Sequence, residues 1–309
     1  MRIVVTGASG RLGRSVTAVL RDAGHLVLSV DRAILAGDDG EAIDLKDAAA
    51  TAGVLGRFAP DAVVHLAAIA VPFSAPERTI FTTNTGMAFT VIEAAVAAGA
   101  SRVLVASSPT VLGYGAPDWA PARLPLDERE HRRPTNAYAL SKVCVEDAVE
   151  MFARTNPGIR FATFRPCYVI APDEWAGAPT QQGHTMIERL QRPEFAAVSL
   201  FNYLDGRDAG EFVDAWLRAD GAPSGARYFV SAPDALALRP LSELLPVFHP
   251  GTARLAAALT GTASAFSSGA ALRDLGWAPR RSWRTELPAD AVALLEASER
   301  TLETERSAS

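Results

Sequence analysis

The segment Thr6-Gly7-Ala8-Ser9-Gly10-Arg11-Leu12-Gly13 limits what this chain can fold into more than any other stretch of its sequence. It follows a β-branched run at residues 2–5 and precedes a helical pattern of apolar residues. Glycines permit a tight turn that brings backbone amides close to a ligand, and the following helix adds positive potential at its N-terminus. A strand, a glycine turn and a helix in this order predict the first crossover of a dinucleotide-binding sheet. The alternative is a plain turn between a strand and a helix.

Strand-like and helix-like segments alternate along the first half of the chain. The expected strands are residues 2–5, 26–30, 62–66, 102–106 and 159–164, and the expected helices include residues 82–98 and 138–154. Strands that alternate with long helices need crossover connections, which produce a parallel sheet covered on both faces. After Pro166 the pattern becomes irregular, with expected strands at 200–204 and 228–230 and an expected helix at 209–218.

These patterns predict an α/β fold, a Rossmann-like doubly wound parallel sheet with a small, partly interleaved C-terminal substrate lobe. Residues 1–168 are expected to form the NAD-binding domain, and residues 198–231 to return to it. Residues 169–197 and 232–300 would form the substrate lobe. Residues 301–309 are polar and are expected to fray.

Composition and charge exclude several classes of protein. The formal net charge is −5 and no basic tract occurs, which argues against nucleic acid as a partner. The two cysteines, Cys144 and Cys167, lack the spacing of a zinc site, so no metal is expected. The N-terminus does not have the build of a signal peptide, and the apolar run at 62–71 is too short to cross a membrane. We therefore expect no membrane association and a cytoplasmic location.

Asp31 closes the second expected strand, 18 residues after Gly13. An acidic side chain at this place accepts hydrogen bonds from the adenosine ribose hydroxyls and repels a 2′-phosphate. Asp31 therefore favours NAD as the cofactor, although a solvated charge at the end of a strand is the alternative. Arg11 and Arg32 keep NADP open as the less favoured choice, because either guanidinium can pair with a phosphate.

Tyr138 and Lys142 stand four residues apart on an expected helix and therefore share one face of it. A lysine ammonium beside a tyrosine favours the phenolate, so the pair can move a proton to or from a carbinol oxygen. Such a spacing is also common on solvated helices. Its value here comes from Ser108, which follows the expected strand 102–106 at the carboxyl edge of the sheet, where open parallel sheets bind ligands.

Together these motifs resemble the extended short-chain dehydrogenases/reductases, including the nucleotide-sugar epimerases, over nearly the whole chain. The glycine segment resembles the family's TGxxGxxG, residues 65–68 (HLAA) its HxAA, and residues 107–111 (SSPTV) its SSxxVYG. The resemblance implies Ser108, Tyr138 and Lys142 as catalytic residues. It implies cofactor contacts at Gly7, Ser9, Gly10, Arg11, Leu12, Gly13, Asp31, Arg32, Asp44, Leu45, Leu66, Ala67, Ala68, Asn84, Ser107, Tyr138, Lys142 and Pro166.

Two departures from the family pattern bear on the reaction. Pro109 and Thr110 stand near the place where the family's dehydratases carry an Asp-Glu pair, so dehydration is disfavoured. Phe201 stands where its epimerases usually hold a diphosphate with arginine. These features are more similar to uronate dehydrogenases. Residues expected to contact a substrate, from their positions, are Ser108, Pro109, Thr110, Tyr168, Gln181, Gln182 and His184.

The sequence therefore predicts an NAD-dependent oxidoreductase that acts on a small, polar, sugar-like hydroxyl or carbonyl compound. One alternative is an epimerase that retains its NADH, because the same three catalytic residues serve both reactions. A second alternative is a non-catalytic nucleotide-sensing protein. The helices at 82–98 and 138–154 carry many apolar residues, and the resemblance suggests that they pair across a two-fold axis. We expect a homodimer joined by a four-helix bundle.

Overall fold

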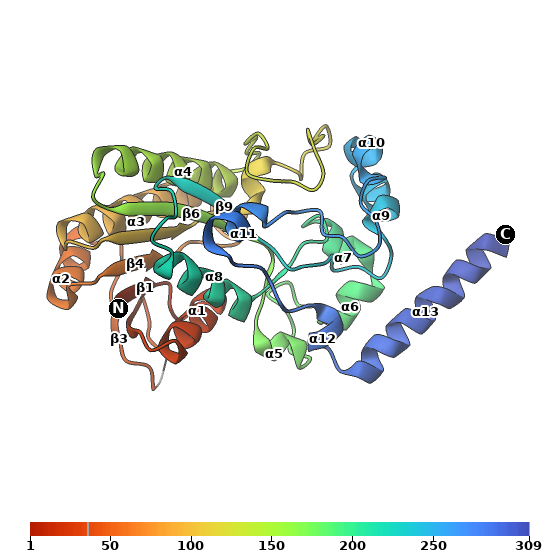
Figure 1. The fold of residues 1–309 in the computed structure, drawn as a ribbon, viewed down its shortest axis with the longest axis horizontal. Coiled ribbons are helices and arrows are strands. Elements are labelled where there is room, and N and C mark those ends of the chain that lie inside the picture. Colours follow the sequence, from red (N-terminus) through yellow and green to blue (C-terminus); the bar gives the residue numbers. More distant parts are fainter. Residues whose placement is uncertain (36, 309) are drawn as a thin grey trace.

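The computed structural model describes residues 1–35 and 37–308, with side chains up to residue 301. Within these residues a seven-stranded sheet has the order β3-β2-β1-β4-β5-β6-β9, and every neighbouring pair is parallel (Figure 1). Its strands are β1 (Arg2–Thr6), β2 (Leu26–Asp31), β3 (Gly40–Ala42), β4 (Ala62–His65), β5 (Arg102–Ala106), β6 (Arg160–Pro166) and β9 (Ala226–Val230). The order reverses between β1 and β4. The doubly wound sheet predicted from the sequence is confirmed.

Helices cover both faces of the sheet. One face carries α1 (Arg11–Asp22) and α8 (Gly206–Arg218), and the other carries α2 (Ala48–Phe58), α3 (Glu77–Ala97) and α4 (Ala137–Thr155) (Figure 1). Successive residues of one strand point to opposite faces. Ile3 accordingly joins the core beneath α1 and α8, whereas Val4 joins the core beneath α2, α3 and α4. Both faces are therefore apolar, which explains the nearly continuous apolar strands of the sequence.

Most of the expected elements are present, with shifted ends. The helix predicted at 82–98 begins five residues earlier, at Glu77. The helix predicted at 138–154 covers Ala137–Thr155, and the side chain of Asn136 caps it by accepting a hydrogen bond from the Ala139 amide at 2.8 Å. By length and composition α3 is long and apolar enough to cross a membrane, but eight of its residues are buried inside the protein.

The strand predicted at 200–204 is wrong. Leu200 and Phe201 have φ angles of 52° and 57°, a left-handed conformation that interrupts any strand. Only β8 (Leu204–Asp205) forms, and it pairs with β7 (Val169–Ile170) in a separate two-stranded sheet. The apolar residues of this segment fill the core in a turn, so their hydrophobicity alone resembled that of a buried strand.

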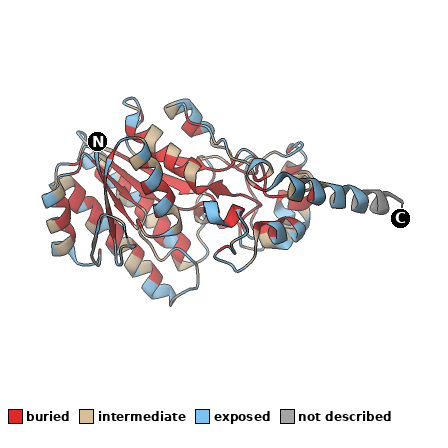
Figure 2. Ribbon diagram, turned by 90° about the horizontal axis from the view of Figure 1, so that it is seen from below, coloured by how far each residue is buried: buried red, intermediate tan, exposed pale blue. Residues whose placement is uncertain are grey.

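Short helices make up the C-terminal lobe. They are α5 (Pro172–Trp175), α6 (Met186–Gln191), α7 (Pro193–Ala197), α9 (Leu241–Phe248), α10 (Ala253–Ala256), α11 (Gly269–Leu275) and α12 (Trp283–Glu286). One buried apolar cluster runs from Ile3 and Phe164 of the sheet to Leu241 and Trp283 of the lobe. The burial pattern in Figure 2 shows the same continuity between the sheet and the lobe.

The C-terminal segment differs from expectation. Helix α13 (Ala289–Ala308) continues through the polar residues that were predicted to fray. Of residues 301–309, only Ser309 lies outside the described residues. Figures 1 and 2 show this helix extending from the body of the protein, and its described part is largely exposed. The polar residues at its end do not prevent a helix, because α13 as a whole is rich in alanine, leucine and glutamate, which are strong helix formers.

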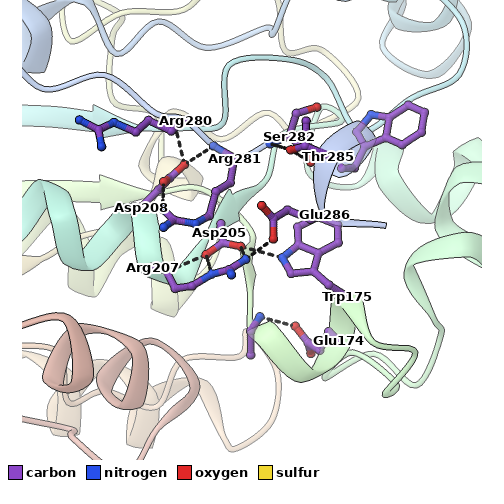
Figure 3. Close-up of polar contacts among 12 residues, drawn as sticks. Glu174, Trp175, Asp205, Arg207, Asp208, Arg280, Arg281, Ser282, Thr285 and Glu286 are labelled. Carbon is purple, nitrogen blue, oxygen red and sulfur yellow. Dashed lines mark hydrogen bonds and ion pairs between the residues drawn. The ribbon is translucent and has the colours of Figure 1, made fainter. Parts of the chain in front are cut away.

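Ion pairs fasten the lobe to the start of α8. Arg207 bonds to Asp205 and also to Glu286 of α12, while the Trp175 indole donates to Asp205 at 2.7 Å (Figure 3). Asp208 accepts hydrogen bonds from the backbone amides of Arg280 and Arg281 at 3.0 and 2.9 Å. Asp205 and Asp208 are fully buried and have structural partners, so they hold the lobe in place.

Candidate active site

The glycine segment forms a tight loop between β1 and α1. Gly7 has a φ of 72°, and a Cβ atom placed on it would lie 2.6 Å from the backbone nitrogen of Ala67. A Cβ atom on Gly13 would collide with the Gly7 carbonyl oxygen. The loop therefore requires glycine at both positions, and it brings its backbone against residues 66–68 after β4. This close backbone cradle at a helix N-terminus fits the pyrophosphate of a dinucleotide.

The Asp31 carboxylate lies beside this loop. It accepts hydrogen bonds from the backbone amides of Ser9 at 3.0 Å and Arg32 at 2.7 Å. The Arg11 guanidinium points elsewhere, because it donates to the Val169 carbonyl at 2.9 Å and pairs with Glu174 at 2.5 Å. Arg11 is thus occupied by protein partners in this structure.

The other expected cofactor contacts include residues that follow β4 and β3. Leu66, Ala67 and Ala68 are half-buried, whereas Leu45 is buried and Asp44 is exposed. A hydrogen bond from the Lys46 amide lowers the pKa of Asp44. Thr6 and His65 share a buried hydrogen bond of 2.7 Å, and burial lowers the pKa of His65 to about 3.

Asn84, expected to contact the cofactor, bonds to groups of the protein in this structure. Its side chain accepts from the Ile69 amide at 2.8 Å and donates to the Ile69 carbonyl at 3.2 Å and the Ser141 hydroxyl at 3.3 Å. The side chain is buried and its polar groups bond within the protein. Asn84 therefore braces the loop after β4 against α4.

Ser108, Tyr138 and Lys142 come together at the carboxyl edge of the sheet. Ser108 follows β5 and caps the short helix η1 (Pro109–Leu112), where its hydroxyl accepts hydrogen bonds from the Thr110 amide and hydroxyl at 3.2 and 2.9 Å. Tyr138 and Lys142 lie on the first turns of α4, and the Lys142 ammonium donates to the Ala106 carbonyl at 2.8 Å. The three side chains are 93–95% buried.

Burial dominates the protonation of this group. Desolvation raises the pKa of Tyr138, and a hydrogen bond with Ser108 opposes that rise. Burial lowers the pKa of Lys142 to about 8, while the charge of Glu146 opposes that fall. The sequence predicts that Lys142 favours the phenolate. In this structure the ammonium lies 5.9 Å from the centre of the Tyr138 ring and donates a hydrogen bond to the Ala106 carbonyl.

A buried ion pair beneath α4 was not predicted from the sequence. The Glu146 carboxylate, one turn after Lys142, accepts from Arg165 at 2.7 and 2.9 Å and from the Ser107 hydroxyl at 2.7 Å. The hydroxyl of Ser107, expected to contact the cofactor, is thus engaged within the protein. The available signal was a glutamate on a helix face that otherwise carries buried residues.

Comparison with known proteins identifies the family. The model of the NAD dependent epimerase/dehydratase family matches residues 3–219. The chain belongs to this family. Curated relatives of the chain are named as dehydrogenases and as 4-epimerases.

Individual relatives are more distant. A uronate dehydrogenase of Pseudomonas syringae pv. tomato is 31% identical over 156 residues, which cover 49% of this chain and 54% of that protein. A UDP-glucose 4-epimerase of Mycolicibacterium smegmatis is 29% identical over 258 residues, covering 74% of this chain and 76% of that protein. The chain spans about half the length of the first curated relatives it matches.

Solved structures share the fold at low sequence identity. A short-chain dehydrogenase/reductase superfamily protein from Agrobacterium tumefaciens, solved with bound NAD, superposes with a TM-score of 0.70 at 20% identity. The superposition covers 99% of this chain and 100% of that one. At this identity the likeness shows the fold alone, and the family match carries the assignment to a class of enzyme.

The residues predicted to contact a substrate lie in several different parts of the structure. Pro109 is buried in η1, and Thr110 bonds to Ser108. Gln181 is exposed, and His184 stacks on Phe195 with ring centres 3.9 Å apart.

Tyr168 and Gln182, in contrast, both contact Arg189 of α6. The Arg189 guanidinium lies 4.2 Å from the centre of the Tyr168 ring, and it donates to the Gln182 amide oxygen. Sequence analysis missed Arg189, because a single arginine on a short helix carries no recognisable pattern.

Proposed function

We propose that this protein is an NAD-dependent oxidoreductase that transfers a hydride between nicotinamide and the hydroxyl- or carbonyl-bearing carbon of a small, sugar-like substrate. The observation that carries the proposal is the joint burial of Ser108, Tyr138 and Lys142 at the sheet edge that also holds the glycine loop. Buried titratable groups with shifted pKa values at a ligand-binding edge are typical of a catalytic site.

Each of the three side chains has a separate task. The Tyr138 hydroxyl exchanges a proton with the substrate oxygen, and the Ser108 hydroxyl holds that oxygen in line with the tyrosine. The Lys142 ammonium lies 5.9 Å from the centre of the Tyr138 ring, and its charge stabilises the phenolate that forms when the proton leaves. Bound NAD supplies the hydride acceptor, held by the loop at residues 6–13 and by Asp31.

The second candidate is an epimerase that retains its NADH and acts on a nucleotide sugar, because a UDP-glucose 4-epimerase aligns with most of this chain. Phe201 argues against it. The ring is fully buried and contacts the Phe248 ring at 5.8 Å between centres, so it offers no charge to a diphosphate. A non-catalytic sensor is the third candidate, and the complete catalytic set argues against that function.

The test is a substrate screen that follows absorbance at 340 nm with NAD and with NADP. Neutral sugars, sugar acids and UDP-sugars are the substrate arms, and Tyr138→Phe is the control. We expect NADH to accumulate with a free sugar or sugar acid and NAD, and protein isolated without tightly bound nicotinamide. Interconversion of UDP-sugars by protein that retains its nicotinamide, with no net NADH, would instead establish an epimerase.

We also propose a homodimer through α3 and α4, which pack against each other. Much of the apolar content of these helices cannot contact a partner subunit, because it is buried in the core. The buried residues are Val91, Ile92, Val145, Val149 and Phe152. The apolar side chains left exposed on the two helices are instead Phe89, Leu140 and Met151, which are 37–43% exposed. These three side chains are the candidates for the contact between subunits.

A further inference from the structure

Glu146 is a buried carboxylate that the proposed reaction does not use. Its side chain is 0% exposed, and that of Arg165, which donates to it at 2.7 and 2.9 Å, is 1% exposed. Burying such an ion pair is costly, and apolar residues of similar size would fill the same space between a helix and a sheet at least as well. The pair lies one helical turn after Lys142, which indicates a role connected with the catalytic side chains.

Three guanidinium groups surround the Glu146 carboxylate. Arg165 of β6 forms the closest contact, while Arg227 of β9 lies 3.3 Å away and Arg132, in the segment before α4, lies 3.5 Å away. Positive charges at these distances favour the charged form of a carboxylate. Glu146 therefore carries its negative charge inside the protein.

The other members of this cluster balance its charge. Arg132 also pairs with Asp147 at 2.6 Å, and Arg227 also pairs with Glu150, so three arginines face three carboxylates. Residues three or four apart on a helix are neighbours, whereas residues five or eight apart are not. Of the three carboxylates, only Glu146 therefore stands beside Lys142 on α4.

Lys142 and Glu146 reach two consecutive residues at the end of β5. The Lys142 ammonium donates to the Ala106 carbonyl at 2.8 Å, and the Glu146 carboxylate accepts from the Ser107 hydroxyl at 2.7 Å. The two side chains thus hold the same short stretch of backbone against one face of α4. This arrangement brings the ammonium and the carboxylate close together without a direct hydrogen bond between them.

Both contacts lead to catalytic side chains. Burial lowers the pKa of Lys142 to about 8, and the charge of Glu146 opposes that fall. Ser107 precedes Ser108, whose hydroxyl forms a hydrogen bond with Tyr138. A displacement of Ser107 would therefore move Ser108 relative to Tyr138, and loss of the negative charge would favour the neutral amine of Lys142.

Two further titratable groups lie near the Lys142 ammonium, but neither changes its charge near pH 8. Burial, helped by the charge of Lys142, lowers the pKa of His65 to about 3. Burial raises the pKa of Tyr138 above its ordinary value of 10. Glu146 is therefore the group whose removal should change the titration of Lys142.

We propose that Glu146 is a positioning residue of the catalytic site, which keeps Lys142 charged and fixes Ser107, and with it Ser108, against Tyr138. The inference rests on the proposed function, because it assigns a further residue to the same site. Lys142 stabilises a phenolate only as an ammonium, so turnover needs the charge of Glu146 although this buried side chain touches no substrate.

The titration of Lys142 tests the proposal without any substrate. The chain has two lysines, Lys46 and Lys142, so protein labelled with ¹³C-lysine gives two sets of NMR signals, and exposed Lys46 is the internal reference. The Cε signals are followed from pH 6 to 11. We expect a Lys142 midpoint near pH 8 in the wild type and a midpoint lower by about one pH unit or more in Glu146→Gln. The matched control is Glu150→Gln, which removes a carboxylate from the far side of the cluster and should leave the midpoint unchanged.

Two more variants separate charge from folding. Glu146→Gln leaves Arg165 buried without its carboxylate, which destabilises the protein. If this variant does not fold, the double variant Glu146→Gln, Arg165→Met removes both charges, and its Lys142 midpoint should still lie below that of the wild type. Glu146→Asp keeps the negative charge and should restore a midpoint closer to that of the wild type.

Turnover supplies the second arm, with the substrate found by the screen. Glu146→Gln should move the alkaline limb of the kcat profile to lower pH by the same interval as the Lys142 midpoint, and lower kcat at pH 8 by about fivefold or more. Ser107→Ala removes the hydroxyl but keeps the charge of Glu146. It should lower kcat without moving the alkaline limb, because only the placement of Ser108 changes.

The outcomes separate this inference from the proposed function. If the wild type forms NADH, and Glu146→Gln changes neither the Lys142 midpoint nor the pH profile of kcat, the positioning role is overturned and the oxidoreductase stands. A lowered Lys142 midpoint in Glu146→Gln, in a protein that forms NADH with no substrate of the screen, would support the action of Glu146 on Lys142 and overturn the oxidoreductase.

Discussion

Replacing Lys142 with methionine should change how the stability of the protein depends on pH. Lys142 is 95% buried, and burial lowers the pKa of its ammonium from the ordinary value of 10.5 to about 8. This difference corresponds to about 3 kcal/mol in the free energy of unfolding. Below pH 8 the ammonium is charged in both states, and the folded protein bears the whole penalty for burying it.

The sign follows from proton counts. Between pH 8 and 10.5 the unfolded chain still binds a proton at this lysine, whereas the folded protein has released it. The free energy of unfolding therefore rises with pH in this window, by about 1.4 kcal/mol per pH unit from this group alone. Methionine has a similar length and no charge, so Lys142→Met should lack this contribution.

Urea unfolding followed by tryptophan fluorescence at several pH values between 7 and 10 measures the effect. The free energy of unfolding of the wild type minus that of Lys142→Met should stay constant from pH 7 to about 8. It should then increase by about 2 to 3 kcal/mol by pH 10. Lys46→Met is the control, because Lys46 is exposed and is the other lysine in the chain. A difference that stays flat across the whole range would refute the burial argument for Lys142.

Three further predictions concern the site and the assembly. Tyr138→Phe should lower turnover by roughly 10²–10⁴-fold with little change in Tm or NAD affinity, and full turnover on an authenticated substrate would exclude Tyr138 as the proton donor. NAD should bind at least about tenfold more tightly than NADP, about 1.4 kcal/mol, and Asp31→Ala should reduce that preference, as measured by fluorescence titration; equal binding by the wild type would contradict the role of Asp31. Light scattering at micromolar concentration should show a dimer for the wild type and a monomer for Phe89→Lys, and a monomeric wild type would end the dimer proposal.

The parts of the fold that were predictable depend on local patterns. The glycine loop could be recognised because a tight turn against a helix N-terminus requires glycine whatever surrounds it, and Gly7 and Gly13 meet backbone atoms in the structure. The alternation of strands and helices predicted the parallel sheet, because strands separated by long helices need crossover connections. Ser108, Tyr138 and Lys142 could be linked because strand ends and the first turn of α4 meet at one edge of such a sheet.

The parts that were missed depend on which distant segments meet. Phe201 lies in a stretch as apolar as a strand, yet its left-handed backbone forms a turn that only packing against Phe248 and the rest of the lobe selects. The hydrogen bonds of Asn84 could not be predicted either, because its partners, Ile69 and Ser141, are 15 and 57 residues away in the sequence.

The sequence by itself therefore determined the architecture, the glycine loop and the candidate catalytic side chains, because periodicity and turn chemistry are properties of neighbouring residues. Only the tertiary structure decided which charges are compensated. Arg11 pairs with Glu174 and Arg165 pairs with Glu146, whereas Arg189 is buried without a carboxylate partner among the described side chains. Desolvation and pairing depend on every segment that closes around a side chain, and those segments come together only when the whole chain has folded.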